Sequence, residues 1–174
     1  MLVWVTGLSG TGKSAVARRL RDLGHRTVDA DDHGVSAWRC RETGELVVPP
    51  PRQERPADWI ERHGWHIDVE RVRALVDPSD ERPLFLFGAV ENEAEVLALA
   101  DVVVCLVADT ETLRYRLAAR RGNDFGKAPH EIEAVLSWHG VYEDRHAALG
   151  AVMVDATRPL EDVADAVLAA ADRG

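Results

Sequence analysis

Cysteine is scarce in this 174-residue chain: only Cys40 and Cys105 are present, they lie far apart, and no CxxC pair occurs. This scarcity excludes a disulfide framework and a four-ligand zinc site. Long hydrophobic runs are also missing, since no segment approaches the ~20 apolar residues of a membrane span. The apolar start at 1–5 is too short for the core of a signal peptide. We therefore expect a soluble protein of the reducing cytoplasm, without a membrane partner.

Positively charged residues are fewer than negatively charged ones, with 21 lysines and arginines and 30 aspartates and glutamates. The formal net charge of −9 argues against an extended surface for the phosphate backbone of a nucleic acid. A local basic patch that holds one nucleotide is still compatible with this charge. We expect a small-molecule partner rather than a nucleic acid, and the sequence does not indicate an oligomeric state.

Apolar runs alternate with helical patterns along the chain, whose length and 46% hydrophobic content fit one globular domain. Short apolar runs predict five strands, at 2–6, 26–30, 83–87, 102–108 and 152–155. Helical periodicity follows several of them, most completely at 160–171, where one face is apolar. Alternating strands and helices indicate an α/β fold with a parallel sheet covered on both faces.

The region 33–80 departs from this regular alternation. It contains the triple proline at 49–51, several arginines and three of the five tryptophans, with helical patches expected at 58–63 and 69–76. We interpret it as an insertion that binds an acceptor molecule.

Residues 7–14, with the sequence GLSGTGKS, match the phosphate-binding pattern GxxxxGK[ST] between an expected strand and an expected helix. The glycines let backbone N–H groups surround phosphates, and the helix points its positive end at them. Lys13 is expected to reach the terminal phosphates, and the Ser14 hydroxyl to bind Mg²⁺. The expected nucleotide contacts here are Gly7, Ser9, Gly10, Thr11, Gly12, Lys13, Ser14 and Ala15.

Acidic residues follow two of the expected strands. Asp29, Asp31 and Asp32 stand at a strand end, where side chains of a parallel sheet meet the ligand crevice; the alternative is that one of them caps a helix from His33. Asp109 also ends an apolar strand, and it could bind Mg²⁺ as in motor-type ATPases. For Asp109 we favour a helix cap, because a helix is expected immediately after it.

Cations gather after the fourth expected strand, where Arg116, Arg120, Arg121 and Lys127 surround a glycine-containing loop. Charge on a transferring phosphoryl group needs such cations, delivered as water is excluded. The alternative is an exposed, charged helix face.

These features resemble the shikimate kinase and nucleoside monophosphate kinase group of P-loop kinases. The phosphate loop at residue seven, the DxD-like cluster after the second strand and the arginine-bearing helix after the fourth carry the resemblance, which covers most of the chain. It implies a five-stranded parallel sheet in the order 2-3-1-4-5, with the nucleotide at the strand ends. It also implies an acceptor-binding insertion at 33–80 and a mobile lid at 120–128 within a single domain, 1–174.

The resemblance assigns roles to residues outside the phosphate loop. Asp29 resembles the residue near Mg²⁺, and Asp31 the one that orients or deprotonates the acceptor. Arg120 would stack on the adenine, and Lys127 would reach the γ-phosphate, a place where these kinases usually have an arginine. Gly88 resembles a turn glycine that lets the acceptor approach the sheet edge.

The resemblance also places the base near Arg158 and Pro159, where these kinases hold it by backbone contacts. The alternative is an ordinary turn with Pro159 at the first helical position. Arg55, Trp59 and Trp65 of the insertion are candidates for contact with a flat or sugar-like acceptor, or they form only a small core of their own. His63 and His66 have no carboxylate at helical spacing, so a metal site is not favoured there.

The sequence therefore predicts an ATP- and Mg²⁺-dependent kinase that transfers the γ-phosphoryl group to a small molecule. The acceptor would be the hydroxyl of a nucleoside, sugar or shikimate-like metabolite, or a nucleotide phosphate. The alternative is a nucleotide-dependent regulatory or switch ATPase or GTPase without a small acceptor, although the chain lacks an NKxD base-recognition sequence.

Overall fold

The computed structural model describes residues 1–31, 34–51, 54–56, 58–77, 79–119 and 129–173. Five parallel strands form the main sheet: β1 (Leu2–Thr6), β2 (Arg26–Asp29), β6 (Leu84–Phe87), β7 (Val102–Val107) and β8 (Val152–Asp155). Their order across the sheet is β2-β6-β1-β7-β8, which is 2-3-1-4-5 when these five alone are counted along the chain. The α/β fold predicted from the sequence pattern is confirmed, and so is the strand order that the resemblance implies.

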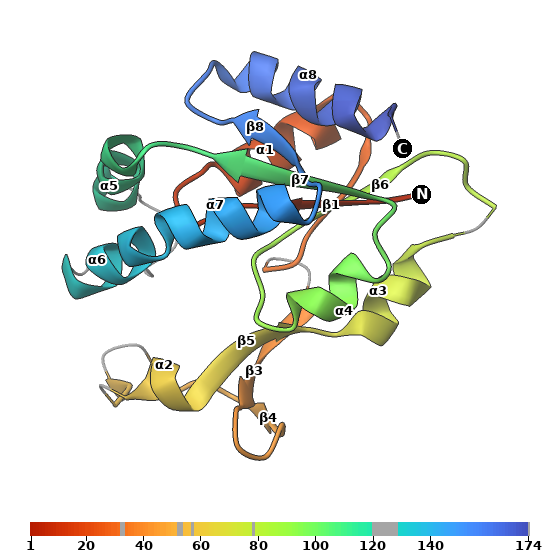
Figure 1. Cartoon of the computed structure of the whole chain (residues 1–174). Coiled ribbons are helices and arrows are strands. Elements are labelled where there is room, and N and C mark those ends of the chain that lie inside the picture. Colours follow the sequence, from red (N-terminus) through yellow and green to blue (C-terminus); the bar gives the residue numbers. More distant parts are fainter. Residues whose placement is uncertain (32–33, 52–53, 57, 78, 120–128, 174) are drawn as a thin grey trace.

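Helices connect these strands and cover the sheet (Figure 1). Their bounds are α1 (Lys13–Asp22), α3 (Val69–Leu75), α4 (Glu93–Leu97), α5 (Thr110–Ala119), α6 (Pro129–Ser137), α7 (His139–Ala148) and α8 (Leu160–Ala171). α1 and α8 pack on one face, whereas α3, α4 and α7 lie on the other. Within the part of the chain that the structure describes, none of the helices has the length and apolar character needed to cross a membrane.

The central strand β1 is buried along its whole length. Successive side chains of a strand point to opposite faces of a sheet. Val3 and Val5 accordingly belong to the core under α1 and α8, and Leu2 and Trp4 to the core under α3 and α4. Burial on both faces explains why the strands read as continuous apolar runs rather than as an alternation.

The insertion between β2 and β6 contains a second, antiparallel sheet. Its strands are β3 (Ser36–Cys40), β4 (Leu46–Val47) and β5 (His63–Ile67), in the order β4-β3-β5, and α2 (Trp59–Arg62) precedes β5. The helical patches expected at 58–63 and 69–76 are confirmed as α2 and α3. The antiparallel sheet was not expected, because arginine, histidine and glycine interrupt the apolar alternation of β3 and β5.

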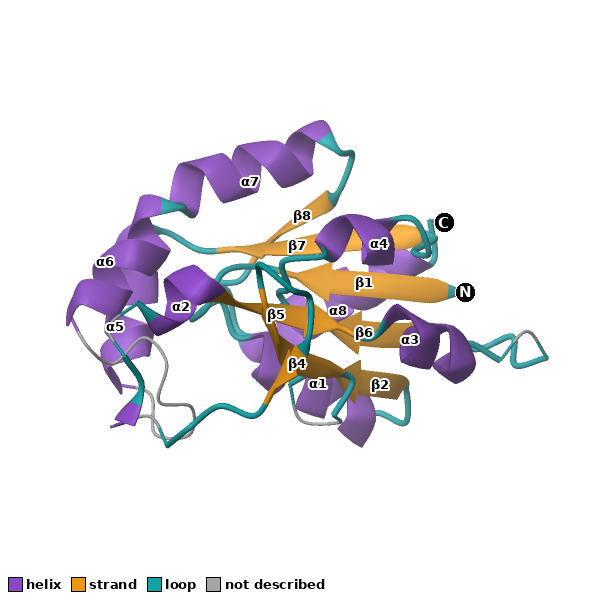
Figure 2. Cartoon of the chain, turned by 90° about the horizontal axis from the view of Figure 1, so that it is seen from below, coloured by secondary structure: helices purple, strands orange, loops and turns teal. Residues whose placement is uncertain are grey.

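Two consecutive residues tie the insertion to the main sheet. The backbone N–H of Glu91 donates to the Trp65 carbonyl at 2.9 Å. The Asn92 side chain accepts from the Ile67 N–H and donates to the Ile67 carbonyl, at 2.9 and 3.0 Å. Figures 1 and 2 agree that α2, α5 and α6 lie at the end of the main sheet to which the strand arrows point.

Candidate nucleotide and acceptor site

The phosphate loop runs from the end of β1 to the start of α1. Gly7, Gly10 and Gly12 all have positive φ, at 147°, 96° and 102°. A Cβ at Gly7 would lie 2.6 Å from the Leu106 carbonyl oxygen of β7, so no side chain fits there. The glycines therefore let the backbone turn closely beside the neighbouring strand, and the first amides of α1 follow directly. This is the strand, loop and helix context that phosphate binding requires.

The side chains of the loop hold its shape. Lys13 Nζ donates to the carbonyls of Gly7 and Leu8, at 2.6 and 3.1 Å. The buried Thr11 hydroxyl donates to the same Leu8 carbonyl at 2.8 Å. Ser14, at the first turn of α1, is exposed. The loop thus presents one ammonium group and one accessible hydroxyl beside the helix N-terminus.

The two described aspartates of the acidic cluster are connected at the carboxyl end of β2. Asp29 is buried, and its Oδ1 accepts a hydrogen bond from the Asp31 N–H at 3.2 Å. The Asp31 carboxylate accepts from Trp65 Nε1 at 2.8 Å. Among the described residues no helix begins between β2 and β3, so the helix-capping alternative for this cluster is wrong. Asp32 and His33 lie outside the described residues.

The insertion brings three tryptophans together. Trp38 lies opposite Trp65 in the register of β3 and β5, with ring centroids 5.5 Å apart, and it meets Trp59 edge-on at 6.1 Å. The Arg55 guanidinium lies 5.8 Å from the Trp38 ring centre and 5.7 Å from that of Trp59. Trp59 is buried and stacks on His63, whereas Trp38 and Trp65 are half-buried. The cluster is therefore a small core under Trp59 and an accessible aromatic surface at Trp65.

Gly88 is buried at the end of β6. A Cβ there would lie 2.7 Å from the Trp4 ring and 3.2 Å from the Ala30 side chain. Close packing against Trp4 is thus sufficient to require glycine at this position, whether or not an acceptor approaches it.

The structure confirms that Asp109 caps α5. Its carboxylate accepts from the Thr112 N–H at 2.7 Å and from the Thr112 hydroxyl at 2.8 Å. These two hydrogen bonds lower the pKa of Asp109. A short acidic side chain that satisfies free N–H groups at a helix start is typical of an N-cap.

The turn between β8 and α8 carries the two residues expected near the base. Pro159 is the N-cap residue of α8, one position before the first helical residue. Arg158 is exposed, and its guanidinium donates to Asp162 at 3.2 Å. Asp155 closes the turn by accepting from the Thr157 N–H at 2.9 Å.

The sequence pattern did not reveal the role of Arg116, which was grouped with the cations around the 120–128 loop. This half-buried arginine of α5 donates to the Thr11 carbonyl at 3.2 Å and to the Ala156 carbonyl at 2.9 Å. It therefore joins the phosphate loop to the turn before α8. The two partners are 105 and 40 residues away in the chain, so no local pattern indicates them. Arg120, Arg121 and Lys127 lie outside the described residues.

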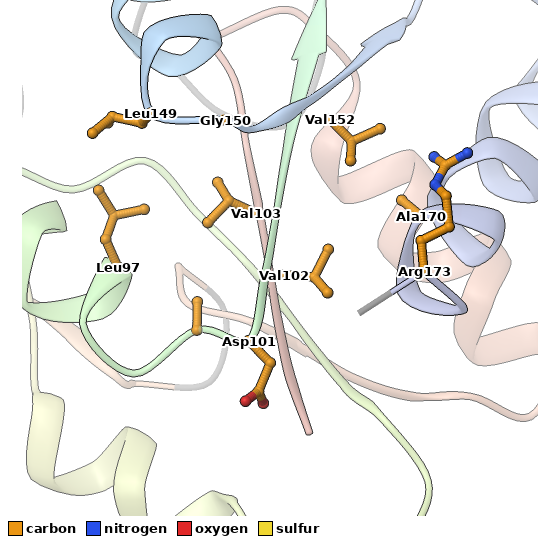
Figure 3. A pocket seen from close by; sticks show the side chains of 10 residues that line it. Leu97, Asp101, Val102, Val103, Leu149, Gly150, Val152, Ala170 and Arg173 are labelled. Atoms are coloured by element: carbon orange, nitrogen blue, oxygen red, sulfur yellow. The ribbon is translucent and has the colours of Figure 1, made fainter.

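A hollow of about 480 Å³ lies elsewhere, at the amino ends of β7 and β8 (Figure 3). Leu97, Val103, Leu149 and Val152 give it an apolar lining, and Arg173 lies at its edge. It is at the opposite end of the strands from the phosphate loop, so it is not part of this site.

Residues 3–136, more than half of the chain, match the family described as AAA domain. The chain belongs to this AAA domain family. The chain is also similar to an Archaeoglobus fulgidus protein named "Putative adenylate kinase", with 30% identity over 172 residues. The match covers 96% of this chain and 80% of that protein.

Kinases of known structure share the fold of this chain. Shikimate kinase from Acinetobacter baumannii, solved with shikimate, has a TM-score of 0.61 at 17% identity, covering 96% of this chain and 90% of that one. A gluconokinase from Sinorhizobium meliloti 1021 has a TM-score of 0.57 at 19% identity, covering 98% and 91%. At these identities the likeness shows the fold alone, and it confirms the resemblance to the shikimate kinase group inferred from the sequence.

Proposed function

We propose that this chain is a small-molecule kinase that transfers the γ-phosphoryl group of ATP, with Mg²⁺, to an acceptor hydroxyl. The observation that carries the proposal is that a phosphate loop and two aspartates lie at the same end of the sheet, where its strands have their carboxyl ends. The loop follows β1, and Asp29 and Asp31 stand at the end of β2, with only β6 between the two strands. In phosphoryl transfer the protein positions the groups and stabilises charge, which this arrangement serves.

ATP would lie along the loop, with its phosphates at the amides of residues 7–15 and at Lys13. The base would lie at the turn of Arg158 and Pro159, and Arg116 holds that turn to the loop. Arg120 and Lys127 stay in the proposal as cations at the nucleotide, where Arg120 would stack on the adenine and Lys127 would reach the γ-phosphate. The chemistry they would supply is stabilisation of charge in the transition state.

The Mg²⁺ ligands we propose are the Ser14 hydroxyl and the Asp29 carboxylate. Both are oxygen donors, the class that Mg²⁺ prefers, and this ion commonly takes only one or two ligands from the protein and the rest from phosphates and water. Among the described residues no group of three or more histidine, cysteine or acidic side chains could hold a metal ion. The donor set therefore fits an ion that arrives with the nucleotide.

Asp31 is the proposed base or orienting group for the acceptor. Its carboxylate would take the proton of the acceptor hydroxyl, whose oxygen then attacks the γ-phosphorus while ADP leaves. Arg55, Trp59, Trp65 and Gly88 are the acceptor residues we propose. Trp65 already contacts Asp31, and its ring offers an accessible flat surface to a sugar-like or ring-shaped molecule.

Three described arginines of the insertion support a hydroxyl acceptor over a phosphate acceptor. Arg41 pairs with Glu91, Arg62 pairs with Asp58, and Arg39 donates to the Gly44 carbonyl. Cations that are engaged by the chain itself are poorly placed to grip a second phosphate group. A nucleotide acceptor, to which the name of the adenylate kinase relative points, is the second candidate.

A screen of acceptors by mass spectrometry tests the proposal. The chain, with ATP and Mg²⁺, is expected to add one phosphoryl group to one class of hydroxyl compound, and Lys13→Ala is expected to abolish transfer without unfolding the chain. Slow ATP or GTP hydrolysis that no acceptor stimulates would instead support the switch protein. Transfer to nucleoside monophosphates alone would move the assignment to the nucleotide acceptor, and full activity of Lys13→Ala would exclude the kinase assignment.

A further inference from the structure

A pair of hydroxyl groups lies directly behind the phosphate loop. Thr6, the last residue of β1, is fully buried, and its Oγ1 lies 2.6 Å from the Tyr142 hydroxyl of α7. Tyr142 also packs in the apolar cluster that contains Leu8. One side chain of α7 therefore contacts Thr6 and packs in the cluster of Leu8, the two residues that flank Gly7.

A buried polar network holds Tyr142 in this place. His146, one turn further along α7, forms a hydrogen bond with the Tyr142 carbonyl through Nδ1 at 2.8 Å, and the two rings lie 4.3 Å apart. His146 Nε2 lies 3.1 Å from both carboxylate oxygens of Glu93. Glu93 in turn accepts from Trp4 Nε1 at 3.0 Å. Trp4 and Thr6 are alternate residues of β1, so α7 is fixed to the same face of this strand at two points.

Attaching a helix through this buried polar network has a high cost in free energy. Glu93 is 2% exposed and His146 is 0% exposed, and burying two charged groups costs free energy that their attraction often fails to recover. Apolar side chains of similar volume would attach α7 at least as firmly. Hydrogen bonds have directions, however, whereas apolar contacts do not. A polar contact is thus better suited to fix the position of one side chain, here that of Thr6.

We propose that Tyr142 is a positioning residue of the phosphate loop, held by the Glu93–His146 pair so that its hydroxyl fixes Thr6, the residue directly before Gly7. The consequence reaches the phosphates, because the next carbonyl along the chain, that of Gly7, accepts the 2.6 Å hydrogen bond from Lys13 Nζ. Movement of Thr6 would displace this carbonyl and with it the ammonium group. The inference rests on the proposed function only in that the loop binds a nucleotide.

Binding of ADP, followed by isothermal titration calorimetry, tests the proposal. We expect Tyr142→Phe to weaken ADP binding by about fivefold, the effect of one ordinary hydrogen bond. Thr6→Val should weaken it similarly, whereas Thr6→Ser, which keeps the hydroxyl, should bind as the wild type does. Tyr115→Phe is the matched control, since the only other tyrosine of the chain lies exposed on α5.

A purely structural role would give a different result. In that case Tyr142→Phe lowers the unfolding temperature but binds ADP with wild-type affinity, and this outcome overturns the proposal. If the two hydroxyls act through the hydrogen bond between them, the double variant with Thr6→Val and Tyr142→Phe should bind no more weakly than either single one. Fully additive losses would show independent effects and would also overturn it.

The proposed function can fail separately. ADP binding does not depend on an acceptor, so a chain that binds ADP, loses affinity in Tyr142→Phe and phosphorylates nothing would refute the kinase while supporting this inference. If the chain phosphorylates an acceptor normally and Tyr142→Phe leaves the ADP affinity unchanged, the kinase assignment is supported and this inference is refuted.

Discussion

The indole N–H of Trp65 donates a 2.8 Å hydrogen bond to the carboxylate of Asp31. This contact joins β5 of the insertion to the end of β2, across 34 residues of chain. It places the aromatic surface of the insertion beside the carboxylate that we propose as the base. The residues that we propose for acceptor binding and for the reaction are thus connected by a direct contact.

The first prediction concerns this contact. Asp31→Asn should lower kcat by about 10²–10⁴-fold, the usual contribution of a positioned acid–base group. Trp65→Phe keeps an aromatic ring but removes the donor, so it should lower kcat by about tenfold with little change in KM for ATP. Both are measured with the acceptor that the screen identifies. Trp138→Phe, a change at an exposed tryptophan before α7, is the control. An unchanged kcat in Asp31→Asn would remove this residue from the mechanism.

The second prediction compares two glycines. Gly7→Ala should abolish nucleotide binding, because its Cβ would collide with the Leu106 carbonyl and φ is positive there. Gly140 lies inside α7, and a Cβ added there would meet no atom within 4 Å, so Gly140→Ala should raise the free energy of unfolding by about 0.5–1 kcal/mol. Calorimetric ADP binding and urea unfolding measure the two effects. Wild-type ADP affinity in Gly7→Ala would contradict the close approach of loop and β7.

The sequence was sufficient to predict the features that depend on a local pattern of residues. The phosphate loop and the five strands of the main sheet were predicted, because a short motif and continuous buried runs mark them directly. The helix cap at Asp109 was predicted for the same reason, since a cap acts on the next few residues.

Features that depend on contacts between distant segments were not predictable. The sheet β4-β3-β5 was missed because its strands pair through the backbone, while polar residues obscure their alternation. The role of Arg116 was missed because both of its acceptors are carbonyl groups, which any residue carries. The Glu93–His146 pair spans 53 residues, and nothing in the sequence distinguishes these two side chains from exposed ones.

The third prediction tests Arg116. Its two terminal nitrogens donate hydrogen bonds to two carbonyls that belong to different segments. A lysine has a single ammonium group, which does not reproduce this two-pronged geometry. Arg116→Lys should therefore weaken ADP binding by about fivefold to tenfold through loss of one or two hydrogen bonds. Arg114→Lys, at an exposed position of the same helix, should bind ADP normally. Equal affinities for the two variants would show that the link between the loop and the turn before α8 does not matter for binding.

The last prediction concerns pH. Burial opposes the charge on Glu93, but hydrogen bonds from His146 and Trp4 outweigh it and lower the pKa of Glu93 from 4.5. Burial likewise opposes the charge on His146, but its hydrogen bond to Glu93 outweighs this and raises the pKa of His146 from 6.5. Arg145, 3.7 Å from Glu93, is the other charged group facing the pair from α7.

The direction of each shift fixes the pH range in which the pair stabilises the fold. The contribution of Glu93 is complete above pH 4.5 and is lost as the pH falls through its lowered pKa. The contribution of His146 is complete below pH 6.5 and is lost as the pH rises through its raised pKa. The free energy of unfolding should therefore be greatest between these two values and decline on both sides.

Urea unfolding from pH 4 to about pH 8 measures this profile; it stops there because burial raises the pKa of Cys105 to about 12, which adds a separate loss above its ordinary value of 9.0. His146→Gln should be less stable than the wild type at pH 6, and the decline toward pH 8 should disappear in it. His25→Gln, on the edge of Phe85, should keep that decline. A wild-type profile that is flat from pH 5 to about pH 8 would contradict the raised pKa of His146, because folding would then take up no proton in this range.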